Sequence, residues 1–224
     1  MIRKFKHQKF AVKNPEKGGE SKFTDANALG FGWRPGQKRF SVEIDSCEIN
    51  GAGGSEGLKL SFCHDVAVKN STILGGYEDC VDIVRGSNIS FENCKFISQD
   101  SAQHVTIKAG VKNVSFRKCK FINPFRSIIN GACIDLGNWA DYDDVDRPKT
   151  RGISIEDCGM ENIKFRALYR RLYSETPKVN SSNGFGIKVP NFFVRIFWKM
   201  QRKGWLGERR RFPESWLKIY DIEK

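Results

Sequence analysis

The sequence lacks any apolar run long enough to span a bilayer, and its basic beginning, MIRKFKHQKFAVKN, contains no apolar stretch of the kind found in secretory signals. The sequence therefore predicts a chain without a signal peptide or transmembrane segment, which is cytoplasmic when made or associated with a virion. Hydrophobic residues make up 39% of the 224 residues, which argues against global disorder and suits one domain, with or without an appendage.

Paired cysteine motifs are also absent. The chain has seven cysteines but no C-x-x-C pair. An odd number of cysteines without this spacing disfavours both a zinc site and a complete disulfide framework, and it fits a reducing compartment.

A large net charge is missing from most of the chain, although the whole sequence carries +12. Residues 162–224 hold 15 Lys and Arg against 5 Asp and Glu, whereas residues 1–161 hold 23 against 21. Any electrostatic attraction to an acidic partner would therefore act through the C-terminal segment.

What the chain does contain is a repeat. One pattern, apolar-x-apolar-x-x-small-x-apolar, occurs as VEIDSCEI (42–49), VAVKNSTI (66–73), ISFENCKF (89–96), VSFRKCKF (114–121) and ISIEDCGM (153–160). A second, shorter pattern precedes the last four copies: LKL (58–60), VDI (81–83), VTI (105–107) and IDL (134–136). The first four copies start 23 to 25 residues apart, so the repeat has a nearly fixed length.

The alternation of apolar and polar residues predicts β-strands, and no helical period fits the segments between them. Two or three short strands per turn of about 24 residues predict an all-β fold, a right-handed parallel β-helix of about five coils. An antiparallel sandwich would not keep this register, and a doubly wound α/β fold needs helices that are absent.

Stacked coils bring repeated residue types into columns. One predicted column is a buried ladder of small residues, Cys47, Ser71, Cys94, Cys119 and Cys158, where reduced cysteine acts as a small hydrophobe. Core stacks of Phe91 on Phe116 and of Phe96 on Phe121 are expected beside it, and Asn88 and Asn113 are expected at matching corners.

The second strand pattern predicts which polar residues face outward. With Leu58, Val81, Val105 and Ile134 inward, alternation places two columns outside: Gly57, Cys80, His104 and Cys133, then Lys59, Asp82, Thr106 and Asp135. A third column is Ser61, Val84, Lys108 and Gly137, and a corner column begins with Glu56 and Asp79. This face gathers Glu56, Glu78, Asp79, Asp82, His104, Lys108 and Asp135. A solvated surface with structural cross-strand pairs is the alternative interpretation.

The loop 137–151, GNWADYDDVDRPKTR, interrupts the repeat beside this face, where a long insertion often carries function. Trp139 and Tyr142 are expected to stack on a sugar ring. Four acidic residues of the loop offer oxygen ligands to a hard cation, namely Asp141, Asp143, Asp144 and Asp146.

Three motifs on successive coils, GSEGLKL (54–60), YEDCVDI (77–83) and AQHVTIK (102–108), resemble the N-T-D-G, D-D-C and G-H-G motifs of polygalacturonase-type glycosidases. The chain is thus similar, over about residues 41–165, to short members of the pectin-lyase-like β-helix group. This resemblance implies a polysaccharide substrate and inverting hydrolysis, with catalytic roles for the residues at the motif positions: Glu56, Glu78, Asp79 and His104.

Two alternatives accompany this interpretation. The lyase branch of the same group implies a Ca²⁺ ion held by Asp82 and Asp135, with or without Asp79, and Lys108 as the base. The candidate substrate contacts of this face and its loop are Lys59, Asp82, Asp135, Trp139 and Tyr142. The hydrolase family's R-I-K substrate clamp falls at Cys133-Ile134-Asp135, which has neither base. That departure favours a non-catalytic module that binds glycan or assembles with partners, as in viral or phage receptor-binding proteins.

Three regions are expected: a lead-in or cap (1–40), the β-helix (41–165) and a basic C-terminal segment (166–224). Within the last region, about 191–203 shows a basic amphipathic helical pattern. Its expected role is to cap the open end of the β-helix. The alternative partners of this basic segment are a second subunit, an anionic membrane surface and nucleic acid.

Overall fold

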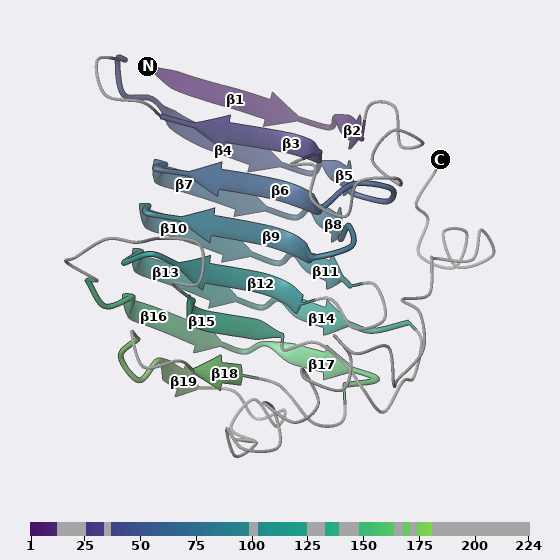
Figure 1. Cartoon of the computed structure of the whole chain (residues 1–224). Helices are drawn as coiled ribbons and strands as arrows, with labels where there is room; N and C mark the ends of the chain where they lie inside the picture. Colours follow the sequence, from purple (N-terminus) through teal and green to yellow (C-terminus); the bar gives the residue numbers. More distant parts are fainter. Residues whose placement is uncertain are drawn as a thin grey trace.

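The computed structural model describes residues 1–12, 26–33, 37–98, 103–124, 133–138, 148–163, 168–170 and 174–180. Its strands form three parallel sheets that stack coil upon coil (Figure 1). In the part of the chain described, one sheet has seven strands and the other two have six each, and no helix there is long and apolar enough to cross a membrane. The predicted all-β parallel solenoid is confirmed.

The seven-stranded sheet, sheet A, contains β1 (Ile2–Lys6), β4 (Ser41–Asp45), β7 (His64–Lys69), β10 (Ser87–Glu92), β13 (Lys112–Arg117), β16 (Arg151–Glu156) and β19 (Lys178–Asn180). Sheet B contains β2 (Lys9–Ala11), β5 (Glu48–Asn50), β8 (Thr72–Leu74), β11 (Lys95–Ile97), β14 (Lys120–Ile122) and β17 (Gly159–Glu161). Sheet C contains β3 (Asn27–Gly32), β6 (Glu56–Ser61), β9 (Asp79–Val84), β12 (Gln103–Lys108), β15 (Ile134–Asn138) and β18 (Leu168–Arg170). Each coil therefore runs A, B, C before the next begins.

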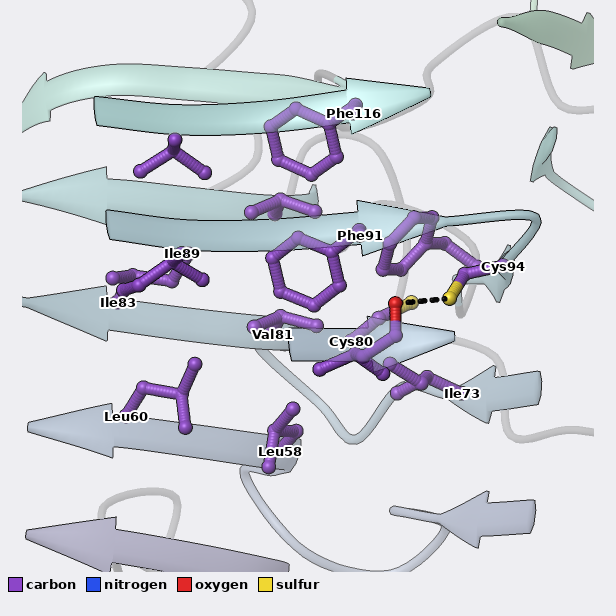
Figure 2. Packing of buried hydrophobic residues seen from close by; sticks show 14 of the residues in the cluster. Leu58, Leu60, Ile73, Cys80, Val81, Ile83, Ile89, Phe91, Cys94 and Phe116 are labelled. Atoms are coloured by element: carbon purple, nitrogen blue, oxygen red, sulfur yellow. Dashed lines mark hydrogen bonds between the residues drawn. The ribbon is translucent and has the colours of Figure 1, made fainter. Parts of the chain in front are cut away.

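The core follows from the repeated residue types. Phe91 pairs with Phe116 and Phe96 with Phe121 across adjacent strands, so that like rings stack. The ring centroids lie 5.2 Å apart in the first pair and 4.9 Å in the second. Figure 2 shows Phe91 directly below Phe116. The predicted aromatic stacks are confirmed.

The predicted cysteine ladder is confirmed as well. All seven cysteines are buried and free. The ladder thiols contact backbone groups, as when Cys94 Sγ donates to the Val68 carbonyl at 3.5 Å (dashed in Figure 2). The backbone N–H of Cys47 donates to Ser71 Oγ at 3.1 Å, so serine can replace cysteine in this column. The column thus serves packing.

The coils turn at stacked residues with positive φ. Asn88 and Asn113 both have φ of 56°, and each side-chain amide donates to the residue below it: Asn88 to Asp65 at 3.0 Å and Asn113 to Asn88 at 3.1 Å. Asparagine tolerates this left-handed conformation and forms a ladder there, whereas most other residues would be strained. The next coil has Gly152, with φ of 68°. Backbone pairing of the parallel strands sets the spacing between coils, and these ladders link the corners of successive coils.

Three features differ from, or add to, the sequence-based expectations. Strands β1 to β3 lie within the region expected to be a lead-in, and they pair in parallel with β4 to β6. A register shift after Ile107 pairs Lys108 with Asn138, so the expected partner Gly137 is wrong. The helix expected at about 191–203 lies outside the described residues, as do the cap, membrane and subunit roles assigned to it.

Candidate functional site

The candidate site is the outer face of sheet C, at the middle of the coil stack. The register aligns Lys59 with Asp82, Asp82 with Thr106, and Thr106 with Asp135, on β6, β9, β12 and β15. Their inward neighbours Leu58, Val81, Val105 and Ile134 belong to the hydrophobic core. The predicted alignment of this column is therefore confirmed, and Asp82, Thr106 and Asp135 within it are buried.

Asp82 is the electrostatic centre of this face. Its Oδ2 lies 3.5 Å from Lys59 Nζ on one side and 3.2 Å from Lys108 Nζ on the other. The Asp82 side chain is 1% exposed, while the two lysine side chains are 20% and 14% exposed. A carboxylate so well removed from water is stabilised by two cations, and it holds both lysines in place.

Lys59 also reaches Glu56, whose Oε1 lies 3.3 Å from Nζ. Glu56 is buried, and burial raises its pKa to about 7, with the nearby carboxylates of Asp82 and Glu78 adding to the rise and Lys59 opposing it. A carboxyl group with such a pKa carries a proton for much of the time near neutral pH.

Asp79 lies beside Glu56, because the two residues pair across β6 and β9. Its Oδ1 accepts a hydrogen bond from Thr106 Oγ1 at 2.7 Å. Burial and the charges of Asp82 and Glu56 raise the pKa of Asp79 well above its usual value. Glu78, the next residue back, is only half-buried. The structure thus gathers four of the predicted acids, two of which favour the protonated form.

His104 does not face outward, and that prediction is wrong. The imidazole is fully buried and its ring lies edge-on to Phe121 of the core, with centroids 5.7 Å apart. Its Nε2 lies 2.9 Å from the Ile122 carbonyl oxygen, which accepts the hydrogen bond when Nε2 carries the proton. This histidine packs at the corner between sheets B and C, away from a solvent-side ligand.

The rest of the same column is also inward. Cys80 and Cys133 are fully buried in the core cluster, and Figure 2 shows Cys80 beside Ile73. A Cβ on Gly57 would meet the Ile73 side chain at 2.9 Å. The sequence did indicate that this column faces inward, because two of its four members are cysteines and cysteine is among the most buried residue types.

The proposed metal ligands are not adjacent. Thr106 lies between Asp82 and Asp135 in the column, so their strands are about 10 Å apart. A Ca²⁺ ion binds oxygens at 2.3–2.6 Å, which this spacing does not favour. Among the described residues no three His, Cys, Asp or Glu side chains form a metal-binding group. Trp139, Tyr142 and the acidic residues of their loop lie outside that part of the chain.

Replacing Asp82 with asparagine is expected to destabilise the fold by about 3 kcal/mol, because two poorly solvated ammonium groups lose their shared carboxylate. Glu92→Gln is the matched control: Glu92 also pairs with two cations, Lys69 and Arg117, but on the more exposed surface of sheet A, where a loss below about 1 kcal/mol is expected. Urea unfolding of both variants measures the difference. Equal losses would contradict the central role given to Asp82.

Comparison with known proteins agrees with this architecture. The family model described as a right-handed β-helix region matches residues 19–146, more than half of the chain, and the chain belongs to that family. This fold is common to carbohydrate-active enzymes and adhesins. No curated protein and no solved structure matches the chain.

Proposed function

We propose that the protein is a polysaccharide-directed β-helix that hydrolyses glycosidic bonds at the outer face of sheet C. The observation that carries this proposal is the burial of Glu56, which raises its pKa to about 7, beside the half-buried Glu78. Glycoside hydrolysis needs one protonated carboxyl group and one carboxylate. Buried Glu56 supplies the first and Glu78 the second.

In this mechanism Glu56 donates its proton to the leaving glycosidic oxygen, while Glu78 accepts a proton from the attacking water. Asp79, whose pKa is also raised by burial and by the charges of Asp82 and Glu56, is held beside the acid by the hydrogen bond that it accepts from Thr106. Lys59 lies between Glu56 and Asp82 and is the most exposed cation of this cluster. It is the group placed to contact an acidic or hydroxyl substituent of the sugar.

The lyase alternative has less support. A lysine that abstracts a proton must be neutral, and Lys108 faces the Asp82 carboxylate at 3.2 Å, which stabilises its ammonium form. The register also separates the two carboxylates assigned to Ca²⁺.

A non-catalytic glycan-binding or assembly module is the second candidate. The observation in its favour is that His104 lies in the core and that Glu56, Asp79 and Asp82 are each at most 6% exposed. Carboxylates that contact lysines and a threonine can stabilise the stacked coils without taking part in catalysis. Glycan or partner binding would then involve the surface around them.

Release of sugar products from acidic and neutral polysaccharides, with and without Ca²⁺, tests these candidates. New reducing ends without unsaturated sugars are expected for the wild type, with a loss of at least about 100-fold for Glu56→Gln, because proton donation is removed. Glu92→Gln on sheet A is the matched control and should retain full activity. Unsaturated products that require Ca²⁺ would move the assignment to the lyase. Binding without any product would establish the non-catalytic module.

A further inference from the structure

A second feature lies well away from the acidic face. Strands β3 and β6 of sheet C end, and β4 and β7 of sheet A begin, at the left of Figure 1. The side chains at this corner line a partly open cavity of about 100 Å³. Its lining includes three aromatic residues and three polar ones: Trp33, Phe40, Phe62, Arg39, His64 and Asp65. Glu56 starts β6 and Phe62 follows its end, which separates the two sites by about 20 Å of strand.

The aromatic rings of the cavity are each accompanied by a guanidinium group. Arg39 Cζ lies 5.2 Å from the Trp33 ring centroid, Arg85 Cζ lies 5.5 Å from that of Phe62, and Arg3 Cζ lies 3.9 Å from that of Phe40. These contacts bring three positive charges to one corner, although positive and negative residues are nearly balanced over residues 1–161.

The indole of Trp33 is fixed in place. Its Nε1–H donates to the Gln37 carbonyl at 2.8 Å, which sets the ring plane, and the ring is half-buried. Phe62 remains 36% exposed, at a corner residue with φ of 57°. A pre-oriented ring loses little entropy when a ligand packs against it.

The polar groups indicate which ligand fits. Arg39 is exposed, and none of the described carboxylates forms an ion pair with it. Asp65 is exposed and accepts one hydrogen bond, from Asn88, so its carboxylate retains acceptor capacity for hydroxyl groups. His64 Nδ1 lies 2.6 Å from Ser87 Oγ, and burial, aided by Arg39, lowers the pKa of His64. The cavity thus combines an aromatic wall, a cation and a hydroxyl acceptor.

We propose that this corner cavity is a binding site for an acidic sugar unit, whose carboxylate pairs with Arg39 and whose ring packs against Trp33. A mixed set of this kind suits a sugar acid better than a phosphate, because Asp65 repels a doubly charged anion yet binds hydroxyl groups. About 100 Å³ accommodates the charged end of one sugar rather than a nucleotide. The proposal shares only its ligand class with the proposed function, and it concerns binding rather than turnover.

Calorimetric titration of the whole chain with a hexasaccharide of galacturonic acid tests this site. The wild type is expected to bind at low salt, and binding should weaken at least 10-fold in Arg39→Ala and in Trp33→Ala. Lys38→Ala is the matched control, since it removes the same charge one residue away from the cavity lining, and it should bind within 2-fold of the wild type. The fully methyl-esterified hexasaccharide should bind at least 10-fold more weakly, because its carboxylates are neutral.

Several results would overturn the proposal. These are no binding of the hexasaccharide, wild-type affinity in both variants, an equal loss in Lys38→Ala, and tighter Arg39-dependent binding of a dinucleotide. Glu56→Gln serves to separate the two sites. If this variant loses hydrolysis but still binds the hexasaccharide in an Arg39-dependent way, the cavity is a binding site separate from the sheet C face. If the variant loses hexasaccharide binding as well, only the sheet C face binds glycan.

Discussion

Replacing Phe116 with alanine is expected to lower the free energy of unfolding by about 4 kcal/mol, the largest effect of any single change considered. Phe116 is fully buried, lies nearly parallel to Phe91, and contacts Phe96 and Phe121 with centroids 6.1 and 6.0 Å away. The coils cannot close over the vacancy, because backbone hydrogen bonds hold β13 between β10 and β16. The lost ring therefore leaves a cavity between the three remaining aromatic side chains, Phe91, Phe96 and Phe121.

Phe62→Ala is the control for this prediction. Phe62 lies at an exposed corner, and its column already contains alanine at Ala109, with φ of 60° against 57° for Phe62. A loss below about 1 kcal/mol is expected there. Guanidinium unfolding followed by circular dichroism compares the two variants. Similar losses would mean that the stacked core carries no more stability than the corners.

The second large effect concerns pH. Between about pH 4.5 and pH 7 the folded chain keeps a proton on Glu56 that the unfolded chain releases, because burial raises the pKa of this carboxyl to about 7. Stability must therefore fall as pH rises through this interval, by about 3 kcal/mol from this group alone. Asp79, whose pKa is also raised, acts in the same direction.

Glu56→Gln isolates that contribution, because an amide of the same shape carries no titrating proton. The variant is expected to match the wild type near pH 4.5 and to exceed its stability by about 3 kcal/mol at pH 8. Urea unfolding at both pH values measures the difference, and Glu92→Gln should run parallel to the wild type. His64 opposes the trend in both proteins, since its lowered pKa favours folding as pH rises. Parallel profiles for Glu56→Gln and the wild type would show that Glu56 is ionised in the folded state.

The coil architecture could be predicted because the interior repeats its residue types. The phenylalanine stacks and the cysteine ladder each require one residue of a given size per coil, and a spacing of 23 to 25 residues places them in register. Strands β1 to β3 were not predicted, although Phe5, Phe10 and Phe31 pair with Ile44, Ile49 and Leu60 and so stand at the repeated inward positions. In β1, Arg3 stands where the repeat has Val42, and this polar residue breaks the apolar alternation.

The candidate site could be predicted only in part. The column of Lys59, Asp82, Thr106 and Asp135 follows from strict alternation, and the structure has it. Strict alternation fails one residue earlier: His104 and its inward neighbour Val105 are both fully buried. The strand begins at a corner at that point, so two consecutive side chains face apolar surroundings. A prediction from strict alternation assigns consecutive residues to opposite faces, and it therefore misplaces a residue at such a corner.

The ladders at the corners limit how the chain can change in length. Asn113 hydrogen bonds Asn88, and Asn88 hydrogen bonds Asp65, at separations of 25 and 23 residues. An insertion of a few residues within a strand or at one of these corners would break these contacts and displace the aromatic stacks together. An insertion between strands does not, because β13 and β16 pair in register although the loop 137–151 lengthens the coil between them. Whole coils and the loops between strands are therefore the two units by which such a chain can change in length.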